Sequence, residues 1–328
     1  MPEIKLLGKK EAIERITTQI SSKKLPHAIM LVGEKGIGKS VFADYICKLL
    51  FCDGVSAPCG ECAPCKKIEK GIHPDIFKIY PEGKSETIGV KTIAPIKEHI
   101  YIKPNDAAYK IFIIYSAERM NRFAQNALLK MIEEPPEDTF FIFTCQNAQA
   151  LLPTVRSRVS MISLSVADES EITDELCARF ADKTRFEIEK AAKMSGGNIG
   201  RAIEILTSAE TNALYEGLEN IAKALCDKDR ASLCLALAPY SKKKENALEM
   251  VSLLKLVFRD VCAGKSAQSE HLSGCTVAVK TLSPYVSLKS ALEAIDACDE
   301  FVRMVEGNAY LPLALTALEI RLGEIIKR

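Results

Sequence analysis

The sequence has no tryptophan, few other aromatic residues and almost no net charge. Aromatic side chains make up 6% of its 328 residues, and 44 lysines and arginines are balanced by 43 aspartates and glutamates, which leaves a net charge of +1. A chain without excess positive charge lacks a general electrostatic attraction to nucleic acid or to an anionic membrane. Any contact with DNA must therefore come from a local patch or through a partner.

Long apolar segments are also missing. No run approaches the roughly 18 apolar residues that cross a membrane as a helix. The N-terminal stretch MPEIKLLGKKEAIERI mixes charged and apolar residues where a secretory signal would have an apolar core. We therefore expect a cytoplasmic protein without membrane contact. A content of 48% hydrophobic and 27% charged residues is typical of globular proteins, and the length suffices for two or three domains.

The stretch from His27 to Val41, HAIMLVGEKGIGKSV, contains a complete P-loop pattern. An apolar strand leads into a glycine-rich turn, and an amphipathic helix begins directly after it. In such a loop the backbone amides turn towards a phosphate, the lysine reaches the outer phosphates, and the next hydroxyl coordinates Mg²⁺. These residues permit binding of ATP or ADP. The candidate phosphate-binding residues are Gly33, Gly36, Gly38, Lys39 and Ser40.

The strand that would complete a hydrolytic site lacks the required acids. This apolar strand begins at Lys110. In a working P-loop NTPase it ends in an aspartate that holds Mg²⁺, usually followed by a glutamate that polarises the attacking water. Tyr115 and Ser116 occupy these positions, and neither supplies a negative charge. Glu118 follows beyond the strand end, so the pattern favours a site that holds phosphate without hydrolysing it.

Four of the twelve cysteines cluster within fourteen residues, at Cys52, Cys59, Cys62 and Cys65. Four thiolates at this spacing can surround one Zn²⁺ tetrahedrally and leave no open position for catalysis. A redox C-x-x-C pair is the alternative interpretation, but it requires a thioredoxin-like βαβ context, and the P-loop already occupies that part of the chain. The spacing therefore predicts a structural zinc site, with the remaining cysteines buried as small hydrophobic residues.

The order of the apolar runs predicts a parallel α/β domain followed by helices. The expected strands are 28–32, 76–80, the strand from Lys110, 139–145 and 159–164. A helix is expected over 88–101, where Pro95 indicates a kink or an early boundary. The predicted domains are 1–164, which contains the cysteine knuckle 52–65, a small helical domain at 165–208, and five or six helices at 209–328.

Several motifs resemble those of the AAA+ clamp-loader subunits of bacterial DNA polymerase III, most closely the delta-prime type. The matching stretches are LPHAIMLVGEKGIGKS at 25–40, CGECAPC at 59–65, HPD at 73–75, NALLKMIEEPP at 126–136 and LLPTVRSR at 151–158. Weaker similarity continues through SGGNIGRA and NAYLPLALTALEIRL. The resemblance implies an AAA+ P-loop domain with a zinc-binding insertion, a helical lid, and an all-α collar that holds five subunits in a ring.

The resemblance also assigns roles to single residues. Arg158 matches an arginine finger that acts in trans on a neighbour's ATP, although Val159 stands where the family motif has cysteine. A guanidinium suits this role because it can meet a transferring phosphate at two oxygens. From the residues alone, Arg158 would be interpreted as an ordinary solvated loop arginine.

The sensor positions depart from the family pattern. The first sensor falls on Thr144 or Cys145, and a one-residue ambiguity in the spacing leaves both open. In the second-sensor region the usual arginine position holds Gly200, and Arg201 follows it. This departure further weakens the case for ATP hydrolysis by the chain alone.

Three classes of function compete. The first is a delta-prime-type subunit without ATPase activity of its own, in a hetero-pentamer with gamma/tau motor and delta subunits that loads the sliding clamp onto primed DNA. The second is an ATP-hydrolysing gamma/tau-type subunit or a related AAA+ ATPase. The third is a zinc-dependent nucleic-acid-binding module, but its knuckle lacks the interleaved basic and aromatic residues that base stacking requires. The missing acids favour the first class, with DNA contacted through the assembly.

Overall fold

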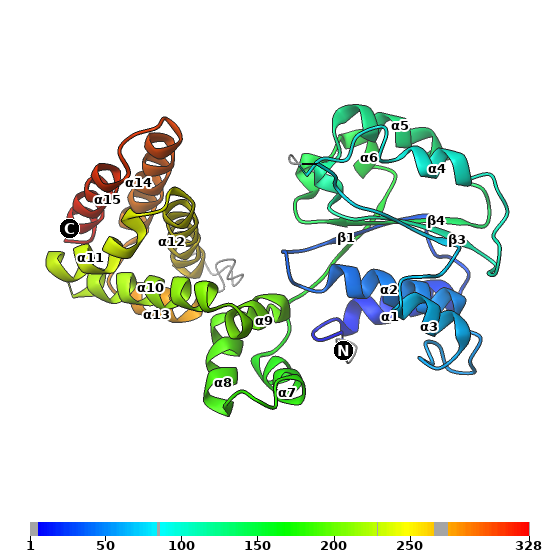
Figure 1. The fold of residues 1–328 in the computed structure, drawn as a ribbon, viewed down its shortest axis with the longest axis horizontal. Helices are drawn as coiled ribbons and strands as arrows, with labels where there is room; N and C mark the ends of the chain where they lie inside the picture. Colours follow the sequence, from blue (N-terminus) through cyan, green and yellow to red (C-terminus); the bar gives the residue numbers. More distant parts are fainter. Residues whose placement is uncertain (1–5, 84–85, 228, 266–274, 328) are drawn as a thin grey trace. The chain divides into compact units, whose positions relative to one another are not determined.

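A computed structural model of the chain describes residues 6–83, 86–227, 229–265 and 275–327. It divides into two compact units, Met1–Ala167 and Asp168–Arg328 (Figure 1). The first unit contains a parallel sheet with helices, and the described part of the second unit is helical. The predicted division of the second unit into a lid and a collar stays a prediction.

The first unit is built on a five-stranded parallel sheet with the order β2-β3-β4-β1-β5. Its strands are mostly continuous apolar runs because helices cover both faces of the sheet. All five predicted strands are confirmed. They are β1 (Ala28–Val32), β2 (Ile76–Ile79), β3 (Lys110–Ile114), β4 (Thr139–Cys145) and β5 (Ser160–Ser163).

Two separate apolar clusters fill the space between the sheet and its helices. On one face, alternate strand residues such as Ile29 and Ile113 pack against α1 (Lys10–Ser21), α2 (Lys39–Phe51) and α3 (Ala63–Glu69). On the other face, residues such as Met30 and Phe112 pack against the remaining helices of the first unit. Figure 1 shows these helices on the side of the sheet opposite α1, α2 and α3. These are α4 (Ala94–His99), α5 (Arg122–Glu133) and α6 (Pro153–Arg156), together with the short 3-10 turns η1 (Ala117–Arg119) and η2 (Ala148–Ala150).

The helix predicted over 88–101 is much shorter in the structure, and this prediction was wrong in its first half. Only Ala94–His99 is helical, and Pro95 lies in its first turn. Proline is tolerated there because the first-turn N–H groups have no partner within the helix. The backbone N–H of Ile88 instead donates to the carbonyl of Arg119 at 3.0 Å. The start of the predicted helix is therefore paired with a segment that is distant in sequence.

Asp75, the last residue of the HPD motif, fixes the loop that leads into β3. Its side chain is fully buried and accepts hydrogen bonds from the backbone N–H groups of Asn105 (2.6 Å), Asp106 (2.8 Å) and Ala107 (3.1 Å). The ring nitrogen Nδ1 of His73 accepts a bond from the Asp75 N–H at 3.2 Å. The motif is therefore a turn that sets the approach of β3 to the sheet.

The second unit has one large apolar core that most of its helices share. Met194 and Ile205, early in this unit, belong to the same cluster as Leu218, Phe258 and Phe301 further along the chain. None of the described helices has the length and apolar character needed to cross a membrane. The helices are α7 (Glu169–Arg179), α8 (Arg185–Met194), α9 (Ile199–Thr207), α10 (Ala209–Cys226), α11 (Arg230–Leu237), α12 (Lys244–Lys265), α13 (Thr276–Leu282), α14 (Leu288–Glu306) and α15 (Leu311–Lys327), with the 3-10 turn η3 (Ala238–Ser241).

Gly217 allows α10 to approach the buried Tyr240, and Gly217→Ala is expected to destabilise the second unit. A Cβ at this position would lie 1.9 Å from the Tyr240 hydroxyl oxygen, so the ring must move. Overpacking of this kind costs about 1–3 kcal/mol. Urea unfolding followed by far-UV circular dichroism measures the change.

Gly323→Ala is the matched control, because a Cβ at Gly323 in α15 meets no atom within 4 Å. This substitution should raise stability by about 0.5–1 kcal/mol through helix propensity alone. Equal effects of the two substitutions would contradict the packing explanation.

Candidate phosphate, arginine-finger and metal sites

The P-loop connects β1 to α2 with the backbone that its glycines predict. Gly36 and Gly38 have left-handed φ angles of +86° and +98°, and α2 begins at Lys39 directly after them. The ammonium of Lys39 donates hydrogen bonds to the carbonyl oxygens of Gly33 and Glu34, both at 2.7 Å. The Lys39 ammonium thus already has two hydrogen-bond acceptors in the loop. A bound phosphate would compete with these carbonyl groups for the ammonium.

The end of β3 carries a packed tyrosine where a hydrolytic site needs an acid. Tyr115 is buried, and its ring stacks on Tyr80 with the centroids 4.5 Å apart and the planes within 6°. Burial raises the pKa of the Tyr115 hydroxyl, so this side chain stays neutral. The Ser116 N–H donates to the Thr144 hydroxyl at 2.9 Å. Neither residue can supply the charge that Mg²⁺ requires.

Glu118, which the sequence placed beyond the strand end, lies at the end of β4 in the structure. The turn η1 brings its carboxylate to the end of β4, where Oε2 accepts a hydrogen bond from the Gln146 N–H at 3.3 Å. Two effects raise the pKa of the Cys145 thiol to about 12: burial, which is the larger, and the negative charge of Glu118. Burial lowers the pKa of Lys39, and Glu118 is the charged group that most opposes this effect.

The two candidates for the first sensor differ in their surroundings. The Thr144 hydroxyl accepts a hydrogen bond from the Ser116 N–H, whereas the Cys145 thiol is buried near Glu118. The choice between these two residues as the first sensor stays open. In the second unit, Gly200 and Arg201 lie in the first turn of α9, where the Asn198 side chain accepts a hydrogen bond from the Arg201 N–H at 3.2 Å.

Arg158 lies just after α6, and its guanidinium is about one-third exposed, at 37%. Nε lies 2.5 Å from Oε1 of Glu133 in α5, and Nη1 donates to the Thr154 carbonyl at 2.9 Å and to the Ser157 hydroxyl at 3.1 Å. These partners belong to α5, α6 and the residue after α6, while α2 packs on the other face of the sheet. Exposed ion pairs contribute little free energy, so Arg158 can exchange Glu133 for another anion at low cost.

The four predicted cysteines come together between α2 and α3. Their sulfur atoms all lie within 4.8 Å of one another, close to the ~3.8 Å spacing of four sulfurs around one Zn²⁺. Cys52 Sγ accepts hydrogen bonds from the N–H groups of Gly54 and Cys59, both at 3.3 Å. The cluster can therefore bind a metal ion such as zinc.

Backbone donors within the knuckle favour the thiolate form that a metal requires. Hydrogen bonds from the N–H groups of Cys62 and then Glu61 lower the pKa of Cys59 to about 6. Burial has the opposite effect on Cys65 and raises the pKa of its thiol to about 12. Metal binding would thus release protons from the cluster, because thiolates are the coordinating species.

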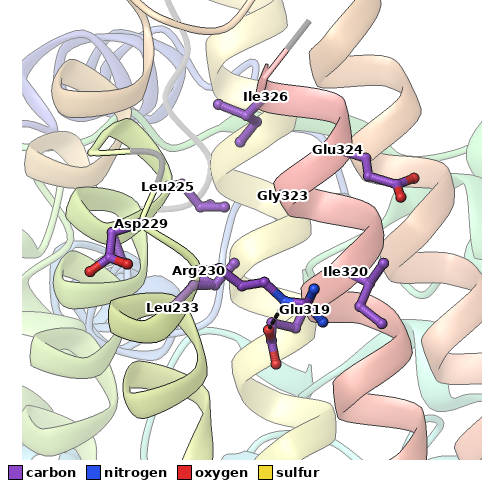
Figure 2. Close-up of a pocket in the computed structure, with 10 residues that line it drawn as sticks. Leu225, Asp229, Arg230, Leu233, Glu319, Ile320, Gly323, Glu324 and Ile326 are labelled. Atoms are coloured by element: carbon purple, nitrogen blue, oxygen red, sulfur yellow. Dashed lines mark hydrogen bonds and ion pairs between the residues drawn. The ribbon is translucent and has the colours of Figure 1, made fainter.

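The second unit has a separate small pocket between the end of α10, α11 and α15 (Figure 2). Its volume is about 180 Å³, below the roughly 300–1,000 Å³ that ligand sites typically occupy. Nε of Arg230 donates to Oε1 of Glu319 at 3.1 Å across this pocket.

Comparison with known proteins identifies the family. A family model described as "DNA polymerase III, delta subunit" matches residues 8–168. The DNA polymerase III subunit delta' of Bacillus subtilis is 31% identical over 263 residues, which cover 77% of each chain. The chain belongs to the DNA polymerase III delta' and gamma/tau clamp-loader family.

Other members of this family are similar over shorter stretches. The DNA polymerase III subunit gamma of Buchnera aphidicola from Schizaphis graminum is 34% identical over 170 residues, which cover 51% of this chain and 46% of that subunit. The chain thus spans about half the length of this gamma relative. A solved gamma subunit-related protein from Thermotoga maritima is 20% identical, with a TM-score of 0.42 and coverage of 96% of this chain and 99% of its own.

Family membership confirms the resemblance found in the sequence motifs. The five-stranded parallel sheet with its P-loop, the four-cysteine insertion and the helical C-terminal unit confirm the predicted AAA+ fold class. An identity near 31% to a delta' subunit and 34% to a gamma subunit does not separate these two types within the clamp-loader family.

We expect the purified chain to carry one metal ion in its cysteine cluster. Cys59→Ser should remove most of this metal, because three thiolates bind far more weakly than four, and should lower the melting temperature. Elemental analysis of reduced protein measures the metal content. Cys234→Ser, which changes an exposed cysteine outside the cluster, is the control and should keep the metal. A metal content near zero in the reduced wild-type protein would contradict a metal site.

Proposed function

We propose that the chain is the delta-prime-type subunit of a DNA polymerase III clamp loader and does not hydrolyse ATP itself. The observation that carries this proposal is the end of β3, where the buried Tyr115 and the adjacent Ser116 stand in place of the two acids of a hydrolytic site. Without these acids, neither Mg²⁺ nor the attacking water has its usual partner. The relatedness to a delta' subunit over 77% of each chain supports this assignment.

In this proposal the chain works within a hetero-pentamer. Its partners are gamma/tau motor subunits and a delta subunit, and the assembly places the ring-shaped sliding clamp on primed DNA. The near-zero net charge agrees with DNA contact through the assembly. The helices from residue 209 onward form the collar in which the subunits meet.

Arg158 supplies the catalytic contribution of this chain, as an arginine finger in trans. It meets the phosphates of ATP held by a neighbouring motor subunit and stabilises the charge that develops during transfer. Three features support the role: partial exposure, a surface ion pair with Glu133 that is readily exchanged, and a position on the sheet face opposite α2.

The metal in the knuckle is a structural zinc. Cys52, Cys59, Cys62 and Cys65 provide four sulfur ligands, the set typical of closed zinc sites. The ion fixes the loop between α2 and α3 and leaves no coordination position for a substrate.

A gamma/tau-type motor is the second candidate function. The complete P-loop and the carboxylate of Glu118 at the end of β4 favour it, because an acid near the phosphate site is one requirement of hydrolysis.

An ATPase assay on the reconstituted assembly distinguishes the two candidates. With motor and delta subunits, clamp and primed DNA, Arg158→Ala in this chain should remove the contribution of one ATP site, because a finger accelerates its site by about 10³ or more. Lys39→Ala should leave the rate unchanged. Arg185→Ala, which removes an exposed arginine with a similar surface ion pair in the second unit, is the control. If Lys39→Ala lowers the rate as much as Arg158→Ala, the chain is a motor subunit.

A further inference from the structure

The chain segment after β3 has a fixed conformation that brings Glu118 to the end of β4, beside the strand that leads into the P-loop. Ser116 adopts a left-handed conformation, with φ of +51° and ψ of +55°, which turns the chain back into η1. The Thr144 hydroxyl holds the Ser116 N–H at 2.9 Å, and the Arg119 N–H donates to the Ser116 carbonyl at 2.8 Å. A left-handed serine costs conformational energy, so the surrounding bonds are needed to maintain this turn.

The carboxylate of Glu118 and the P-loop are attached to the same strand end. Oε2 of Glu118 accepts a hydrogen bond from the Gln146 N–H at 3.3 Å. The carbonyl of Cys145, one residue earlier, accepts a hydrogen bond from the N–H of Gly33 at 3.1 Å, where the P-loop begins. The end of β4 therefore fixes the acid and the phosphate loop relative to each other.

The charges in this region centre on Lys39. Its ammonium is partly buried and bonds to two loop carbonyls at 2.7 Å. Of the charged groups around it, Glu118 interacts most strongly, followed by the Cys145 thiol and Glu34. Burial raises the pKa of Cys145, so the thiol is neutral near pH 7 and Glu118 is the main negative charge acting on the lysine.

We propose that Glu118 is an internal counter-ion of Lys39 that competes with the phosphates of ATP or ADP for this lysine. Its negative charge also repels a phosphate that enters the loop. A carboxylate fixed here by Gln146 therefore weakens nucleotide binding without changing any P-loop residue. This inference concerns the chain's own phosphate site and does not depend on Arg158 acting as a finger.

Calorimetric titration of the full chain with ADP tests the proposal. The buffer contains neither Mg²⁺ nor a chelator, so that no metal bridges the acid and the phosphates and the cysteine cluster is left intact. Glu118→Gln retains an oxygen that can accept the Gln146 N–H but removes the charge. It should bind ADP about tenfold more tightly than the wild type. Glu98→Gln, which removes an exposed charge on α4, is the matched control and should match the wild type.

A double-mutant cycle shows whether the effect acts through Lys39. In a Lys39→Ala background, Glu118→Gln should give a smaller gain in ADP affinity than in the wild type, because only the direct repulsion between Glu118 and the phosphates is then removed. Melting curves establish that each variant is folded, and Glu118→Ala serves as a second charge-removing variant.

Three results would overturn the proposal. The first is ADP affinity that is unchanged or lower in the charge-removing variants. The second is the absence of measurable binding in all forms, and the third is a gain of undiminished size in the Lys39→Ala background. A repeat with Mg²⁺ that shows weaker binding only in the Glu118 variants would make this residue a metal ligand instead. The assay uses the isolated chain, so its outcome is independent of the ATPase test on the assembly.

Discussion

The parallel pairing of β1 with β4 is the constraint on which the phosphate site depends. The register places Val32 beside Cys145, so both strands end at the same edge of the sheet. From this edge the chain enters the P-loop, and the Cys145 carbonyl holds the first P-loop amide. The segment after β3 is tied to the same edge through Thr144 and Gln146. Residues more than a hundred positions apart thereby share one site.

The charge arrangement at this edge connects the structure to the proposed function. A packed Tyr115 stands where an acid would bind Mg²⁺ at the strand end, while Glu118 places a negative charge at the end of β4, the strand beside the P-loop strand β1. In the proposals made above, both features act against nucleotide chemistry in this chain. Arg158, in contrast, remains partly exposed beside α5 and α6. A subunit whose own phosphate site is silent can still serve a neighbour's site, and this division of roles is the core of the delta-prime proposal.

The local patterns of the sequence predicted most of the fold and much of the site. The P-loop glycines and the four cysteines are encoded by short spacings, and the strands by apolar runs, so each could be recognised without long-range information. Glu118 could not be placed, because its position depends on a left-handed Ser116 and on the neighbouring strand β4. The prediction of a helix over 88–101 was wrong in its first half for a similar reason, since the Ile88 N–H donates to the carbonyl of the distant Arg119. Interactions between distant segments overrode the local pattern in both cases.

The central claim is that this chain occupies a delta-prime position and not a motor position. Native mass spectrometry of an assembly reconstituted from this chain with gamma/tau and delta subunits tests it directly. The account predicts a single copy of this chain in every complex, together with motor subunits, and the same composition for the Lys39→Ala variant. Complexes that contain several copies of this chain and assemble with delta in the absence of gamma/tau would contradict it.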